Sequence, residues 1–80
     1  MKEYKVEWAE YNKLTTKYKD EYDSETVKAE NEPEAIELVK QYIFDNTNHE
    51  EHPEMEITED GIEFKDFEYR CFRAKEVTRY

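Results

Sequence analysis

The chain has 80 residues and a formal net charge of −10, which limits it to one small domain, expected to span residues 1–80. Only 14 residues are Leu, Ile, Val or Phe, a content typical of disordered chains, but seven Tyr and one Trp favour a folded domain with an aromatic core. A single cysteine excludes an internal disulfide, and the absence of an apolar run of about 18 residues excludes a membrane-spanning helix.

The first expected element is a strand over residues 3–10. Charged and large side chains alternate there, which places Tyr4, Val6 and Trp8 on one face of the strand. A helical alternative exists, because large residues also recur with a period near 3.6 from Tyr4 to Tyr22. We favour the strand, since Val, Tyr and Trp suit pleated surfaces and no capping residue precedes Tyr4.

A return strand is expected next, after a turn at residues 12–13. It begins at residues 14–19, breaks near residues 20–24 and resumes at residues 26–29. Tyr18 and Tyr22 have one parity in this segment, whereas Val27 and Ala29 have the other. A one-residue bulge near residues 23–24 would bring all four side chains to the core side of the sheet.

The clearest signal in the chain is an amphipathic helix over residues 31–46. Asn31 can cap its first turn, Glu34 completes a capping-box pattern, and Pro33 is tolerated in that turn. The spacing of apolar residues predicts an inner face formed by Ala35, Ile36, Val39, Tyr42 and Ile43. The outer face is then expected to carry Glu34, Glu37, Lys40, Gln41 and Asp45.

Two further strands are expected after a polar loop at residues 46–53. Met55 and Ile57 alternate with polar residues, and Asp60–Gly61 is a hairpin signal because Gly tolerates a positive φ. The last run, residues 67–74, would place Phe67, Tyr69 and Cys71 on one face. The sequence therefore predicts an α+β fold of the order β-β-α-β-β, or this order with one further short strand, with one small antiparallel sheet and one helix packed on one of its faces.

Candidate catalytic or metal-binding groups are few. His49 and His52 lie three residues apart, whereas a zincin helix needs a spacing of four, so we expect a solvated loop and no metal or other cofactor. Cys71 lies near two arginines but is expected to be a small core or half-buried residue. The many carboxylates offer no reason to select one acid–base pair, and we expect a protein that is not an enzyme.

The negative charge is concentrated in the middle of the chain. Residues 20–64 contain sixteen acidic side chains against Lys28 and Lys40, whereas residues 1–19 and 65–80 each carry +2. Such a segment repels phosphates and membrane headgroups and attracts basic surfaces, so we expect no direct nucleic-acid partner and no membrane partner. A small basic and aromatic patch is a weaker alternative for single-stranded nucleic acid, formed by Tyr11, Lys13, Lys17, Tyr18 and Lys19.

Residues 4–7 followed by residues 26–39 resemble the start of small DpnD/PcfM-like domains, which are short proteins of phages and mobile elements. The resemblance covers about the first 45 residues and implies a strand–strand–helix opening, with no activity or site residues to transfer. It implies a small acidic phage or mobile-element protein, similar in size and charge to anti-CRISPR proteins. The N-terminal residues 1–4 lack the apolar segment of a signal peptide, so a cytoplasmic location is expected, in the host if phage-encoded.

The resulting hypothesis is an acidic protein-binding module that docks onto a basic surface, such as that of a nucleic-acid-binding defence enzyme, by mimicking nucleic acid. One alternative is an assembly protein that forms a homodimer or subunit contact through aromatic residues. Another is a small metal-dependent enzyme that uses His49 and His52. The expected partner-binding residues are Asp20, Glu21, Asp23, Glu34, Glu37, Asp45, Glu50, Glu51, Glu54 and Glu56.

Overall fold

The computed structural model describes residues 1–78 and is of the α+β class, which confirms that part of the prediction. Within these residues one helix and six antiparallel strands are present. The expected order β-β-α-β-β is wrong, because three strands precede the helix and three follow it. The elements are β1 (Lys2–Asn12), β2 (Lys17–Tyr18), β3 (Asp23–Ala29), α1 (Glu32–Asn46), β4 (Glu56–Ile57), β5 (Ile62–Glu63) and β6 (Phe67–Glu76).

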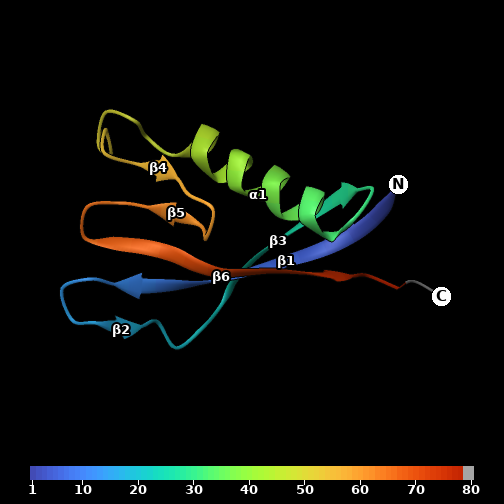
Figure 1. The fold of residues 1–80 in the computed structure, drawn as a ribbon, viewed down its shortest axis with the longest axis horizontal. Coiled ribbons are helices and arrows are strands. Elements are labelled where there is room, and N and C mark those ends of the chain that lie inside the picture. Colours follow the sequence, from blue (N-terminus) through green and yellow to red (C-terminus); the bar gives the residue numbers. More distant parts are fainter. Residues whose placement is uncertain (79–80) are drawn as a thin grey trace.

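Strand β1 is the centre of the sheet. It pairs with β2 and β3 along one edge and with β6 along the other, and β6 continues the sheet to β5 and β4. Tyr4, Val6 and Trp8 are buried on the face that α1 covers, as the alternating pattern predicts. The strand interpretation of residues 3–10 is therefore confirmed, and the helical alternative is wrong (Figure 1).

The predicted return strand is correct only in part. Residues 14–16 form a turn instead of a strand, because the side chain of Asn12 accepts hydrogen bonds from the backbone N–H groups of Leu14 and Thr15. The strand then breaks over residues 19–22, so no one-residue bulge joins β2 to β3. Tyr18 and Tyr22 are 49% and 58% exposed, and their expected place in the core is wrong.

Helix α1 begins where the sequence predicts. Asn31 is its N-cap and accepts a hydrogen bond of 2.9 Å from the backbone N–H of Glu34. The Glu34 carboxylate accepts from the N–H of Glu30, one residue before the position that a capping box would use. Two residues contradict the expected faces, since Lys40 is buried and Tyr42 is exposed. The middle of α1 presents Lys40 to the β4–β5 turn, which the apolar spacing could not indicate.

The Asp60–Gly61 hairpin is present between β4 and β5, but Gly61 does not have the positive φ that we expected. Position 61 requires glycine for a different reason, which is the lack of space for a side chain. A Cβ built on Gly61 would lie 1.8 Å from the carbonyl oxygen of Tyr69, so the backbones of the hairpin and β6 approach too closely for any side chain.

Strand β6 contains a bulge that the sequence did not reveal. Cys71 has φ 60°, and the pairing with β1 shifts register between Glu7 and Ala9. The extra residue reverses the alternation, so that Tyr69 and Phe72 both pack into the core while Cys71 is exposed. The predicted common face of Phe67, Tyr69 and Cys71 is therefore wrong, and so is the expectation of a core or half-buried cysteine.

The core lies between α1 and one face of the sheet (Figure 1). Its larger part packs the buried residues of β1 against Ala29, Ala35 and Val39. Its smaller part contains Met55, Ile62 and Phe64 under the C-terminal end of α1. Ile43, Tyr69 and Phe72 contact both parts, which makes the two clusters continuous along the helix.

Candidate functional site

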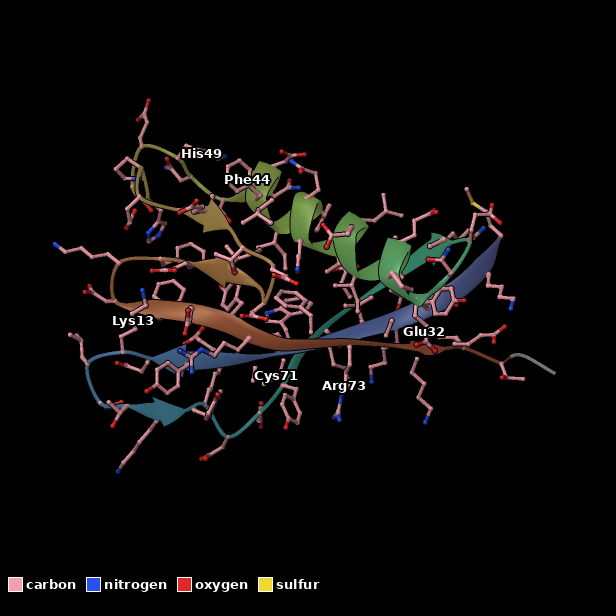
Figure 2. The ribbon with its side chains drawn as sticks, viewed as in Figure 1. Lys13, Glu32, Phe44, His49, Cys71 and Arg73 are labelled. Carbon is pink, nitrogen blue, oxygen red and sulfur yellow. The ribbon has the colours of Figure 1, made fainter. Side chains whose placement is uncertain are left out.

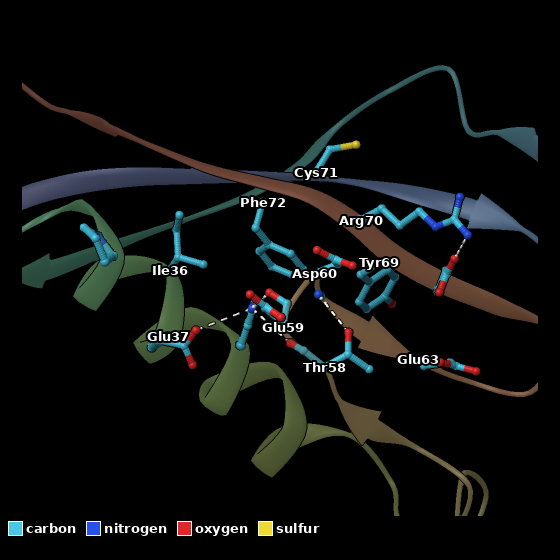
Figure 3. A pocket seen from close by; sticks show the side chains of 14 residues that line it. Ile36, Glu37, Thr58, Glu59, Asp60, Glu63, Tyr69, Arg70, Cys71 and Phe72 are labelled. Carbon is cyan, nitrogen blue, oxygen red and sulfur yellow. Dashed lines mark hydrogen bonds and ion pairs between the residues drawn. The ribbon is translucent and has the colours of Figure 1, made fainter.

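A groove of about 880 Å³ lies between α1 and β6. Its walls are residues 33–40 of α1 and the β4–β5 turn at residues 58–61, while residues 68–72 of β6 form the floor. Figure 3 shows Phe72 between the helix and the β4–β5 turn, with Tyr69 beside that turn. We call this feature the α1–β6 groove.

The groove exists because β5 is short. Its two residues pair with β6 only at Tyr69 and Glu68, and the chain turns away at Gly61. From residue 70 onward, no strand among residues 1–78 pairs with this edge of β6. The side chains of Arg70 and Cys71 point away from the helix (Figure 3), so these residues line the groove mainly with their backbone.

Lys40 fixes one wall of the groove. Its ammonium group lies 3.2 Å from the carbonyl oxygen of Thr58, 3.0 Å from that of Glu59 and 3.4 Å from a carboxylate oxygen of Glu37. These three acceptors match the three N–H donors of a lysine. The ammonium also lies 5.7 Å from the centre of the Phe72 ring. Lys40 thus ties the β4–β5 turn to the helix and has no donor left for a ligand.

The rim of the groove is acidic. Glu37, Glu59, Asp60 and Glu63 are exposed around it, and the half-buried Glu68 pairs with Arg70 on the outer side of β6. Residues 30–63 as a whole contain twelve acidic side chains and one basic side chain, Lys40. Because Lys40 is 3% exposed, the structure removes the only formal cation of this segment from its surface.

Seven of the ten predicted partner-binding residues belong to one continuous part of the structure. They lie on α1, on the loop after it and on β4, and we call them the acidic surface: Glu34, Glu37, Asp45, Glu50, Glu51, Glu54 and Glu56. Asp20 and Glu21 lie instead in the β2–β3 connection, and Asp23 begins β3. Since β2 and β4 are opposite edges of the sheet, these three residues lie apart from the other seven.

Both histidines lie in the loop that follows α1, and each packs against an aromatic ring; Figure 2 shows His49 beside Phe44. His49 makes a hydrogen bond of 2.9 Å with the carbonyl oxygen of Phe44 and meets the ring of that residue edge-on. His52 packs on Phe64 and lies 3.7 Å from Glu54. Within residues 1–78, no group of three or more His, Cys, Asp or Glu side chains is arranged to hold a metal ion.

The face of the sheet remote from α1 carries aromatic and arginine side chains. Arg70 lies 4.0 Å from the centre of the Tyr11 ring, and its guanidinium donates a hydrogen bond to the hydroxyl of Tyr18. The guanidinium of Arg73 lies 5.1 Å from the centre of the Tyr22 ring. The alternative basic patch for single-stranded nucleic acid included Lys13. Its ammonium instead donates a hydrogen bond of 2.6 Å to the carbonyl oxygen of Phe64.

Two groups near the groove have shifted pKa values. Burial raises the pKa of the Tyr69 phenol, and the nearby carboxylates of Glu10 and Asp23 raise it further. The hydrogen bond to Tyr18 raises the pKa of Arg70, with a further contribution from Glu68. Both shifts are upward from pKa values that already lie far above 7, so neither group exchanges protons near pH 7 and the two do not form an acid–base pair.

Sequence reasoning missed the groove because it placed Lys40 on the outer face of the helix. One signal was present, since Ile36, Lys40 and Phe44 are spaced four residues apart and form one row on the helix. A lysine between two large apolar residues in such a row can lie over the core with a buried stem. The unpaired edge of β6 had no comparable signal, because it depends on where β5 ends.

No protein-family model matches this chain, and no curated protein and no solved structure is similar enough to count as a match. In the part of the chain that the structure describes, no helix is both long and apolar enough to cross a membrane.

Proposed function

We propose that this protein is an acidic protein-binding module without catalytic activity, which docks its acidic surface onto a basic surface of another protein. The observation that carries the proposal is the charge of residues 30–63, which contain twelve acidic side chains and only one basic side chain, the buried Lys40. A surface with this charge raises the local concentration of cationic partners and favours their association at low ionic strength.

The partner that we propose is a nucleic-acid-binding enzyme, because a channel that binds phosphates is lined with Arg and Lys. Carboxylates along α1 and its following loop would occupy such a channel as phosphates do, which is nucleic-acid mimicry. The same proposal includes an origin in a phage or mobile element, an inhibitory role of the anti-CRISPR type and an action in the host cytoplasm. The small size and the charge support it.

A pull-down from lysate at low salt, eluted by a salt step, would identify the partner. We expect its affinity to fall steeply between low and physiological salt, because the contact is between exposed charges. Binding that does not change with salt would contradict the proposal.

Two double variants test where the contact lies. Reversing Glu50 and Glu51 to Lys changes the net charge as much as reversing Asp20 and Glu21, but the first pair lies on the acidic surface and the second lies at the opposite edge of the sheet. We expect roughly a tenfold or greater loss of affinity for the first variant and less than about threefold for the second. Equal losses would mean that only net charge matters.

A second candidate is an assembly protein that uses exposed aromatic residues. Tyr18 and Tyr22 are about half exposed near the sheet face remote from α1, and Tyr42 with Leu38 is exposed on the helix. Such side chains are enriched in interfaces. The apparent size in solution at two protein concentrations separates the candidates, since a strict monomer contradicts the second.

A further inference from the structure

The free edge of β6 next to the groove has backbone groups ready to pair. The N–H of Val77 donates to the carbonyl oxygen of Glu3, so Val77 and Glu3 form a hydrogen-bonded pair across β1 and β6. Such pairs alternate along an antiparallel ladder, and therefore Arg73 and Lys75 also direct their backbone groups toward β1. Ala74 and Glu76 then direct theirs to the opposite edge, where no strand of residues 1–78 pairs with them.

This edge differs from the free edge of β3. Strand β3 is also unpaired on its outer side within the described residues, but none of its residues lines the α1–β6 groove. The β6 edge instead continues from Phe72, on the floor of the α1–β6 groove. A segment beside β6 would therefore contact an apolar floor and an acidic rim in addition to the strand edge.

We propose that the α1–β6 groove binds an extended basic segment of a partner protein, which adds to the free edge of β6 as a further strand. The proposal rests on the function proposed above and names the form of its partner. Strand addition supplies main-chain hydrogen bonds for affinity, while side chains that alternate along the segment supply specificity.

The residues that line the groove indicate which side chains the bound segment should carry. An apolar side chain directed inward would lie over Phe72 and Ile36, the apolar residues exposed to the groove between helix and sheet. Basic side chains would reach Glu37, Glu59 or Asp60 on the rim. Lys40 does not oppose them, because its ammonium is held by three acceptors. Because successive side chains of a strand point to opposite faces, the apolar and basic side chains that contact the groove must lie on the same face of the segment, two residues apart.

The first test uses a capped synthetic peptide of about six residues, a length typical of a strand, in which Lys and Val alternate on one face and Thr occupies the other face. It is added to the full chain and followed by amide NMR and hydrogen exchange. We expect the amides of Ala74 and Glu76 to shift and to exchange at least about tenfold more slowly, because they gain acceptors. Unchanged exchange at both amides would overturn the proposal.

A matched peptide separates strand addition from simple charge attraction. Methylating every second backbone nitrogen keeps all charges and side chains but removes the N–H donors along one edge of the peptide. Of the two possible methylation frames, we expect one to lose at least about tenfold in affinity and the other to bind nearly as the parent does. Equal binding of both frames and the parent would overturn strand addition while the acidic docking function still stood.

Protein variants give a second, independent readout. Glu76→Pro removes the edge N–H, whereas Glu76→Gln removes only the charge, and Thr26→Pro places proline on the exposed β3 strand as a control. We expect loss of peptide binding in the first variant alone, with folding of all three checked by circular dichroism. Binding by Glu76→Pro at the level of Glu76→Gln would overturn the proposal.

Alkylation of Cys71 with a bulky maleimide checks which face is used. The thiol is exposed and points away from the helix (Figure 3), so the modified protein should bind the peptide as the unmodified protein does. Loss of binding on alkylation would assign the peptide to the sheet face remote from α1 and would overturn the groove as its site.

Discussion

The ammonium of Lys40 lies 3.0 Å from the carbonyl oxygen of Glu59, in the turn between β4 and β5. This contact joins the middle of α1 to a segment nineteen residues later and holds the turn beside the helix as one wall of the α1–β6 groove. The lysine acts here as a buried hydrogen-bond donor whose positive charge does not reach the surface. It therefore contributes both to the shape of the groove and to the acidity of its rim.

Replacing Lys40 by Met should destabilise the protein by about 1–3 kcal/mol, because the two turn carbonyls and Glu37 lose a charged donor while the apolar stem is kept. Urea unfolding measures the change. Lys28→Met, at an exposed position of β3, is the matched control and should stay within about 0.5 kcal/mol of wild type. Equal stability of the two variants would mean that the hydrogen bonds of the Lys40 ammonium contribute nothing to the free energy of unfolding.

Gly61→Ala should cost about 2 kcal/mol or more, since its Cβ would lie 1.8 Å from the carbonyl oxygen of Tyr69 and the hairpin must move away from β6. We expect a lower denaturation midpoint and loss of amide protection at Ile62, which pairs with Tyr69. Glu59→Ala alters an exposed side chain of the same turn and should change stability by less than about 0.5 kcal/mol. Wild-type stability for Gly61→Ala would refute the close approach.

At position 71 we expect glycine to be tolerated better than valine, which is the reverse of the usual preference in a strand. Cys71 has φ 60°, a left-handed conformation that is strained by about 1–2 kcal/mol for residues other than Gly. Cys71→Gly should therefore be neutral or stabilising by up to about 1 kcal/mol, with part of the gain offset by the entropy of glycine in the unfolded chain. Cys71→Val should be destabilising, although valine favours strands. Thermal unfolding under reducing conditions ranks the three proteins, and a more stable Val variant would contradict the bulge.

Tyr69 should make stability fall at alkaline pH. Burial and two carboxylates raise its pKa in the folded protein, whereas the unfolded chain loses the proton near the ordinary value of about 10. The folded state then binds more protons above that pH, so the free energy of unfolding decreases as pH rises from about 10 toward the raised pKa and is unaffected by this group at lower pH.

Tyr69→Phe removes this group and tests the effect. Comparing unfolding at about pH 9 and about pH 11, the variant should lose less stability than wild type between the two conditions. Tyr42→Phe, at an exposed tyrosine, serves as the control and should lose as much as wild type. Identical losses in all three proteins would show that Tyr69 ionises as freely when folded as when unfolded.

The sequence alone predicted those helices and strands whose patterns involve only residues close together in the chain. Alternation along residues 3–10 placed Tyr4, Val6 and Trp8 inside, and the Asn31 cap with its apolar row set the start of α1. The charge of the acidic segment was also readable, because it requires only a count of side chains. These properties depend on neighbours within about one or two turns of chain.

Tertiary structure alone decided the groove and the features around it. The burial of Lys40, the small residue at Gly61 and the bulge at Cys71 each depend on a strand or turn that lies far away in the sequence. The same holds for the separation of Asp20 and Glu21 from the other predicted carboxylates, which follows from the order of strands in the sheet. Periodicity shows which side chains share a face, but it carries no information on which backbone groups are left without a neighbour. The sequence therefore determined where the negative charge lies, and the fold placed an open strand edge and a groove beside it.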